Sequence, residues 1–142
     1  MISAVADASV AVKWFLPPTE AERDRDRAAA LLQGVRAGQI VLQEPPHWIA
    51  EVAAVLSRLV PTTAHREIED LYAMRIAVVE TAELYTTASR LAVSLDQHLF
   101  DTLYHAVALL VPECTLVTAD ERYYRKARPV GSIALLHDFQ LA

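Results

Sequence analysis

The sequence is poor in cysteine and glycine, and each shortage excludes a class of protein. Its 142 residues include one cysteine, Cys114, which cannot form an internal disulfide, so a reducing cytoplasmic environment is expected. Only three glycines are present and 54% of the residues are hydrophobic, which argues against disorder and favours a compact helical or α/β protein. A chain of this length fits a single domain over 1–142 that folds without a disulfide or a metal clip.

Long apolar runs and an excess of positive charge are also missing. The N-terminal apolar segment lacks a preceding basic region and is broken by Asp7 and Lys13, so it resembles neither a signal peptide nor a membrane span. Thirteen Lys and Arg against eighteen Asp and Glu give a net charge of −5, so no long-range attraction to a polyanion is expected. Any binding of nucleic acid then requires a local basic patch or a bound cation.

Segments with strand and helix patterns alternate along the chain. Apolar or β-branched runs predict strands at residues 2–6, 40–43, 75–79, 115–118 and 132–136. Amphipathic patterns bounded by proline, glycine and capping residues predict helices at 9–16, 20–37, 45–59, 62–74, 81–93, 100–110 and 120–127. Alternation of this kind implies right-handed crossovers. The predicted fold is therefore a three-layer α/β/α domain around a central, mostly parallel sheet of about five strands.

Two aspartates follow apolar strands directly. Asp7 ends the run VAD, and Asp120 ends the run TAD after the strand TLVT. Ligands of open α/β sheets bind beyond the carboxyl ends of the strands, so both carboxylates are expected at a common crevice. Each aspartate could instead be a simple helix cap.

Two further acids belong to predicted helices. Glu51 lies on the apolar stripe of the 45–59 helix, and Asp101 begins the apolar segment FDTLYHAVALLV; an exposed glutamate and a helix cap are the alternatives. Two carboxylates about 4 Å apart repel by roughly 4 kcal/mol at an effective dielectric near 20, so converging acids must protonate or recruit cations. Ligands that are all oxygen favour hard ions such as Mg²⁺ or Mn²⁺.

Four segments together resemble the PIN-domain ribonucleases, and in particular the VapC toxins of bacterial toxin–antitoxin pairs. The segments are VADASVAVKWFLP, PPHWIAEVAAVLSR, FDTLYHAVAL and LVTADERYYRKA, and they cover essentially the whole chain. The resemblance implies a PIN-like domain and a metal-dependent endoribonuclease, in which Mg²⁺ or Mn²⁺ activates water for in-line attack on an RNA phosphodiester. A PIN-fold processing nuclease that is not a toxin is the nearest alternative.

The resemblance also implies roles for individual residues. The four acids match the family's catalytic and metal-binding positions: Asp7 and Asp101 as direct ligands, Asp120 as a ligand or a group that positions a metal-bound water, and Glu51 as a ligand or a supporting anchor. Ser9 and Thr118 match polar positions that line the same site.

Partners follow from the resemblance and from local charge. A VapB-like antitoxin is expected to lay a basic C-terminal segment across the acidic groove, and the toxin is expected to form a homodimer. The basic residues expected near RNA are Lys13, Arg122, Arg125 and Lys126. Tyr123 and Tyr124 alternate with this cluster and either stack on unpaired bases or pack on the sheet beneath a solvated face.

Other functions remain open at this point. His98, Asp101 and His105 have helical spacing that could bind Zn²⁺ or Fe²⁺, and His47 with Glu51 has a similar spacing. A catalytically silent PIN-like module that binds RNA or protein is a further alternative, but the presence of all four acids argues against it. A phosphoacceptor receiver or a haloacid dehalogenase would require acids that this sequence lacks near Asp7.

Overall fold

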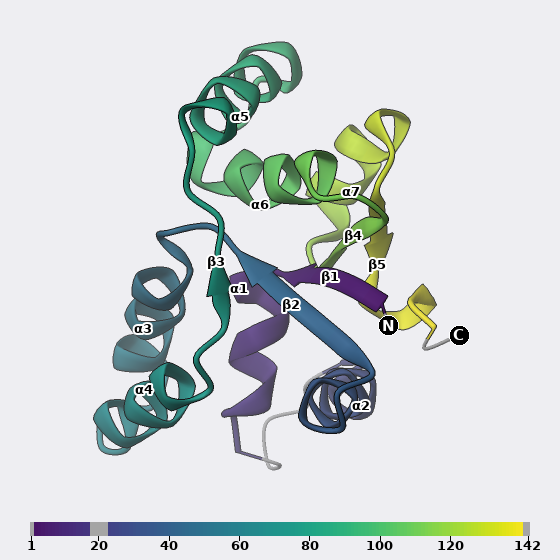
Figure 1. The fold of residues 1–142 in the computed structure, drawn as a ribbon. Coiled ribbons are helices and arrows are strands. Elements are labelled where there is room, and N and C mark those ends of the chain that lie inside the picture. Colours follow the sequence, from purple (N-terminus) through teal and green to yellow (C-terminus); the bar gives the residue numbers. More distant parts are fainter. Residues whose placement is uncertain (1, 18–22, 141–142) are drawn as a thin grey trace.

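The computed structural model describes residues 2–17 and 23–140, and a five-stranded parallel sheet forms their centre (Figure 1). The strands are β1 (Ile2–Ala6), β2 (Ile40–Glu44), β3 (Ala77–Val78), β4 (Cys114–Thr118) and β5 (Ile133–Leu135). Their order is β3-β2-β1-β4-β5, and every pairing between neighbours is parallel. The expected α/β fold is confirmed, with a sheet that is wholly parallel within this part of the chain.

Helices connect and cover the strands. They are α1 (Ala8–Ala11), which continues as a 3-10 turn over Val12–Trp14, α2 (Arg25–Arg36), α3 (Trp48–Leu59), α4 (Ala64–Ala73), α5 (Ala82–Leu95), α6 (Leu99–Leu110) and α7 (Glu121–Ala127). Further 3-10 turns cover Arg128–Val130 and Leu136–Asp138. None of the helices in the described ranges is both long and apolar enough to cross a membrane.

Several predicted boundaries differ from the structure, and the differences are largest in three segments. The two prolines at 45 and 46 precede α3 instead of opening it, because the chain first makes a turn in which the Trp48 amide donates to the Pro45 carbonyl at 3.2 Å. The third strand is only two residues long, not the five expected at 75–79. The expected helix at 20–37 begins at Arg25, and its predicted acidic first turn at 20–22 lies outside the described residues.

The sheet separates two apolar clusters. Val5 and Leu116 belong to the cluster on the side of α6, which also includes residues of α3, α4 and α5, whereas Ala4, Ala6 and Val117 belong to the cluster on the side of α2. Neighbouring residues of a strand project to opposite faces, which explains this alternation. Figure 1 shows α2 on the opposite side of the central strands from α6. Because helices cover both faces, β1 can be apolar throughout.

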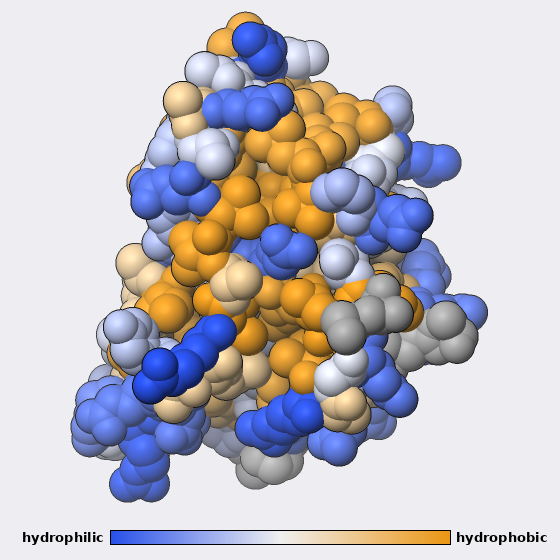
Figure 2. Space-filling model, in the orientation of Figure 1, coloured by the Kyte–Doolittle hydropathy of each residue, from blue (hydrophilic) through white to orange (hydrophobic). Residues whose placement is uncertain are grey.

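Apolar side chains are not confined to the interior. On the face seen in Figure 2, they gather in the upper half of the view, where α5 and α6 lie. Val93 of α5 is 82% exposed and is thus one apolar side chain that reaches solvent.

The chain order reverses at β1, since β2 and β3 extend the sheet to one side and β4 and β5 extend it to the other. Such a reversal leaves a crevice beyond the carboxyl ends of the two strands that flank it, and ligands of open α/β sheets bind there. Asp7 follows β1, and Asp120 follows β4 after one intervening residue. The topology therefore brings both strand-end aspartates to the same edge of the sheet.

Candidate functional site

The carboxylate of Asp7 is held by one side chain from α1 and one from β4. Its Oδ1 accepts a hydrogen bond from the Ser9 hydroxyl at 2.5 Å, and its Oδ2 accepts one from the Thr118 hydroxyl at 2.5 Å. Oδ1 also caps α1 by accepting from the Val10 amide at 3.3 Å. The hydroxyls are themselves fixed, because Ser9 Oγ accepts from the Ala119 amide and Thr118 Oγ1 accepts from the Asp120 amide, each at 3.0 Å. Capping and site formation thus coexist at Asp7.

Burial sets the acidity of Asp7. Desolvation raises the pKa of Asp7 to about 6, and the negative charge of Asp120 adds to the rise. The hydrogen bonds from Ser9, Thr118 and Val10 act in the opposite direction but do not cancel the effect of burial. A carboxylate in this state gains more than an exposed one from a cation placed beside it.

Glu51 enters the same region from the first turn of α3. Its Oε1 accepts a hydrogen bond from the hydroxyl of Tyr104 at 2.6 Å, and Tyr104 belongs to α6. The Tyr104 side chain is buried, and burial together with this hydrogen bond raises its pKa above the usual tyrosine range. Tyr104 therefore stays protonated and donates to Glu51. Tyr104 was not among the residues expected at the site, although its spacing of three residues from Asp101 on one helix could have indicated it.

Asp101 is positioned by a chain of donors that begins on α7. The ammonium of Lys126 donates to the side-chain oxygen of Gln97 and to the carbonyl of Asp96, both at 2.9 Å. Because that ammonium can only donate, Gln97 must present Oε1 to it and turn Nε2 the other way. Nε2 of Gln97 donates to Oδ2 of Asp101 at 2.7 Å. Lys126, which was expected near RNA, instead donates to Asp96 and Gln97, and through Gln97 it helps to position Asp101.

Asp120 lies at the junction of β4 and α7. Its Oδ1 caps α7 by accepting from the Tyr123 amide at 3.0 Å, so the helix-cap alternative holds for this residue as it does for Asp7. The residue is otherwise exposed. An exposed carboxylate with one oxygen engaged keeps its second oxygen available to solvent or to a ligand.

One cleft of about 340 Å³ collects these groups. Its lining includes Asp7, Ser9, Glu51, Asp101, Tyr104 and Asp120. Within residues 2–17 and 23–140, no three acidic, histidine or cysteine side chains are arranged so that together they could hold a metal ion. Mg²⁺ commonly binds one or two carboxylates and keeps several waters, so an open set of oxygen donors suits it. The donor chemistry of the cleft fits a hard divalent cation.

Glu44 is a further acid of this region, and it was not among the residues expected from the sequence. It ends β2 and is fully buried, and its Oε2 accepts from the Ala6 amide at 2.9 Å. Its Oε1 has no hydrogen-bond partner among the described residues. Burial raises the pKa of Glu44 well above its usual range, and Asp7 contributes to the rise. The rule that selected Asp7 and Asp120, an acid at the carboxyl end of an apolar strand, would also have found Glu44 in IVLQE.

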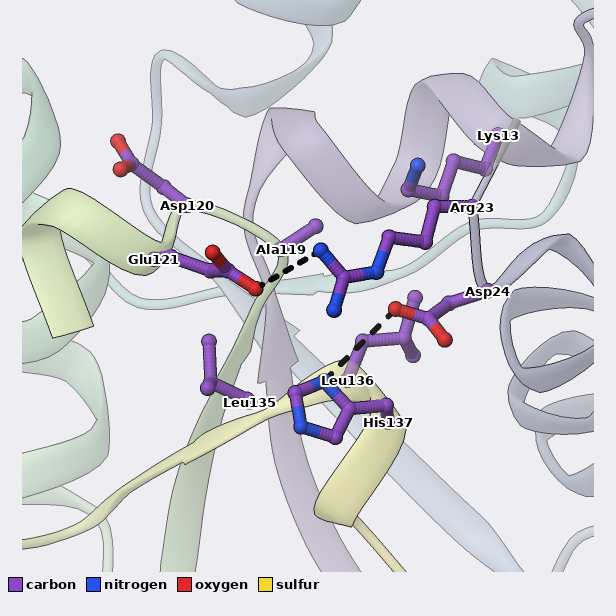
Figure 3. Close-up of a pocket in the computed structure, with 9 residues that line it drawn as sticks. All are labelled: Lys13, Arg23, Asp24, Ala119, Asp120, Glu121, Leu135, Leu136 and His137. Atoms are coloured by element: carbon purple, nitrogen blue, oxygen red, sulfur yellow. Dashed lines mark ion pairs between the residues drawn. The ribbon is translucent and has the colours of Figure 1, made fainter. Parts of the chain in front are cut away.

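A second hollow of about 330 Å³ adjoins the cleft through Asp120 (Figure 3). Lys13 lines it, together with two ion pairs: Arg23 with Glu121 at 3.2 Å, and His137 with Asp24 at 3.8 Å. Figure 3 shows the carboxylate of Asp120 directed away from Arg23, whereas Glu121 points toward it. Lys13 therefore lies beside the acidic cleft but in a separate hollow of mixed charge.

The arginines of α7 and the tyrosine between them differ in exposure. Arg122 and Arg125 are exposed on α7, where they can meet a ligand from solvent. Tyr123 is only 3% exposed, and its hydroxyl bonds Nδ1 of His105 at 2.9 Å, so it packs inside and does not offer a ring to a base. For Tyr123 the packing alternative is the one realised.

The histidine metal site is not formed. The His98 side chain caps α6, where its Nδ1 accepts from the Phe100 amide at 3.0 Å. His105 is fully buried, and its ring nitrogens bond the Tyr123 hydroxyl and the Gly131 carbonyl, the latter at 2.7 Å. Both nitrogens of His105 are engaged, so the spacing of these residues reflects helix packing and not metal ligation.

Comparisons with known proteins agree with this architecture. The sequence matches the PIN domain family over residues 4–129. The fold is similar to the crystal structure of PAE2754 from Pyrobaculum aerophilum, with a TM-score of 0.64 and 18% sequence identity over 96% of this chain and 90% of that one. No curated protein matches the chain. At that identity the structural likeness supports the fold alone.

Proposed function

The chain belongs to the PIN-domain family, whose members are generally nucleases, and on this premise we propose that it is a metal-dependent endoribonuclease that hydrolyses RNA. One observation carries the proposal. Four carboxylates that are far apart in the sequence, Asp7, Glu51, Asp101 and Asp120, line a single cleft at the carboxyl edge of a parallel sheet. Packing alone does not require such a concentration of like charge, whereas phosphodiester hydrolysis with a divalent cation does.

In this proposal Asp7, Asp101 and Asp120 hold Mg²⁺ or Mn²⁺, and Glu51 completes the acidic set. The bound cation would supply charge neutralisation and an acidified water. The protein itself supplies orientation, because a donor holds at least one oxygen of each carboxylate. Carboxylates fixed by such partners spend little side-chain entropy when a ligand binds.

The proposal extends to the biological setting expected from the resemblance. The protein would act as the toxin of a VapBC-type pair, as a homodimer in the cytoplasm. A cognate antitoxin would silence it by laying a basic segment over the acidic cleft. Charge complementarity supports this pairing, since a cluster of carboxylates attracts a segment rich in arginine and lysine.

Cleavage of single-stranded and structured RNA by the purified protein tests the enzymatic proposal. We expect cleavage with Mg²⁺ or Mn²⁺ and loss of at least about 100-fold in rate for Asp101→Asn, because that change removes a charge from the reacting site. Asp70→Asn is the matched control, since it makes the same chemical change on an exposed position of α4. Cleavage that continues in EDTA and survives Asp101→Asn would refute the mechanism.

Expression in a bacterial host tests the toxin proposal separately. Growth arrest is expected for the unaltered protein and not for Asp101→Asn, with relief by the product of an adjacent gene. Normal growth with intact ribonuclease activity would favour a processing nuclease over a toxin.

A further inference from the structure

Phe100 is an exposed aromatic residue placed next to a proposed catalytic acid. It directly precedes Asp101 at the start of α6, and it is 49% exposed. Residues three and four apart share a helix face, so Tyr104 lies on the same face as both Phe100 and Asp101. The open ring of Phe100 therefore flanks the surface of α6 that forms one wall of the acidic cleft.

Two histidines hold this ring in place. The His98 and Phe100 ring centroids are 4.8 Å apart in an edge-on arrangement, and the His47 and Phe100 centroids are 5.2 Å apart. Nε2 of His47 also meets the carbonyl of Phe100 at 2.8 Å, and because a carbonyl only accepts, this nitrogen carries the proton and donates. The backbone and the ring of Phe100 are thus both anchored while half of its surface faces solvent.

The cluster is continuous with the cleft through two contacts. The ring of His47 lies 4.7 Å from that of Tyr104, whose hydroxyl donates to Glu51. Nε2 of His47 is also 3.9 Å from Oε1 of Glu51. The same aromatic residues therefore contact both Glu51 and Phe100, so a continuous set of contacts joins the exposed ring to an acid of the cleft.

His98 adds a polar group at the edge of the ring. Its Nδ1 accepts from the Phe100 amide, so in the neutral ring the proton resides on Nε2. His98 is exposed, and this N–H can donate to a base edge or to a phosphate oxygen. A flat aromatic surface with a donor at its rim is the arrangement that proteins use for unpaired bases of single-stranded RNA.

We propose that Phe100, flanked by His98 and His47, is a stacking platform for an unpaired base of the RNA strand whose backbone enters the acidic cleft. The proposal rests on the proposed ribonuclease function and narrows its substrate to strands that are unpaired next to the scissile bond. In a continuous duplex the bases are stacked on each other and cannot reach a side chain, so duplex RNA is excluded from the platform.

Binding of a short single-stranded RNA oligonucleotide tests the platform. The oligonucleotide carries phosphorothioate linkages, which slow cleavage, and 2-aminopurine, whose fluorescence falls when it stacks. Phe100→Leu keeps an apolar side chain but removes the aromatic face, and we expect it to weaken binding roughly 5- to 100-fold and to abolish the fluorescence quenching. Phe100→Trp should retain both, because stacking tolerates any aromatic ring.

Tyr72→Leu is the matched control, because Tyr72 is another exposed aromatic residue, 72% exposed on α4. This substitution should leave binding and quenching unchanged. Equal affinity and equal quenching for the unaltered protein and Phe100→Leu would overturn the platform while leaving the nuclease proposal intact. A change of oligomeric state in Phe100→Leu, with RNA affinity unaltered, would likewise overturn it and assign the ring to a subunit interface. Failure of the unaltered protein to cleave any RNA would instead refute the proposed function.

Discussion

Replacing Asp7 by asparagine should make the protein more stable in the absence of divalent ions. Desolvation raises the pKa of Asp7 from 3.8 to about 6, so the folded state disfavours its charged form. A shift of this size corresponds to about 3 kcal/mol of destabilisation once Asp7 is ionised. Asparagine has almost the same shape and carries no charge, so Asp7→Asn removes this penalty.

Part of the gain is offset by hydrogen bonding. The side-chain oxygen of the introduced asparagine can still accept from the Val10 amide and the Ser9 hydroxyl, but its NH₂ group faces a Thr118 hydroxyl that in the unaltered protein donates to Oδ2 of Asp7. Thr118 must rotate and lose about one hydrogen bond, worth about 1 kcal/mol. The net increase in the free energy of unfolding is therefore expected to be roughly 2 kcal/mol, or about 6 °C in Tm.

The sign of the pH dependence distinguishes this mechanism from a general effect of the substitution. A carboxyl whose folded pKa is raised contributes stability that is complete below the unfolded pKa of 3.8 and is lost as pH rises through about 6. The difference between Asp7→Asn and the unaltered protein should thus be small near pH 4, grow up to about pH 6, and stay constant above it.

Urea unfolding in EDTA across this pH range provides the measurement, with Asp70→Asn as the exposed control. Added Mg²⁺ should stabilise the unaltered protein more than Asp7→Asn, because a ligand that binds only the folded state raises its stability. An Asp7→Asn protein that is less stable at neutral pH, or a difference that does not vary with pH, would refute the reasoning.

Two further predictions concern Lys126 and His105, whose side chains bond other groups of the protein. Lys126→Met should lower the cleavage rate roughly 10-fold or more, because Gln97 then loses the donor that directs its NH₂ group to Asp101. Arg125→Met removes the same charge from an exposed position of α7 and should alter only the salt dependence of RNA binding. Equal losses of cleavage rate in both variants would contradict the role of Lys126 in positioning Asp101. Burial lowers the pKa of His105, so its ring should titrate below 6.5 by NMR, and the free energy of unfolding should decrease as pH falls below 6.5 because the unfolded state binds the proton more tightly. His105→Asn should show a flatter dependence of this free energy on pH, and an unchanged dependence would contradict the prediction.

The α/β fold could be predicted from the sequence because strand and helix patterns arise from residues that are close together along the chain. The apolar run at 2–6 and the β-branched run at 115–118 form β1 and β4 within a residue of the expected ends. Proline positions were less informative: the prolines at 45 and 46 can begin a helix, but here a turn precedes it. The third strand was predicted too long, since pairing with β2 and not propensity decides where it ends.

The partners of each acid could not be read from the chain. Sequence pattern could select Asp7, Glu51, Asp101 and Asp120 as acids at strand ends and helix starts, and their roles remain a proposal. It could not reveal that Tyr104 donates to Glu51, because the two lie 53 positions apart and meet only when the fold brings the first turn of α3 close to α6.

What the sequence determined by itself was the alternation of strands and helices and the presence of acids at particular ends, since both follow from short-range sterics and the burial of apolar side chains. Only the tertiary structure decided which donors face those acids, that Tyr123 turns inward, and that Phe100 stays exposed. Hydrogen bonds and exposure depend on elements that are distant along the chain, and the packing of the helices against the sheet brings those elements together.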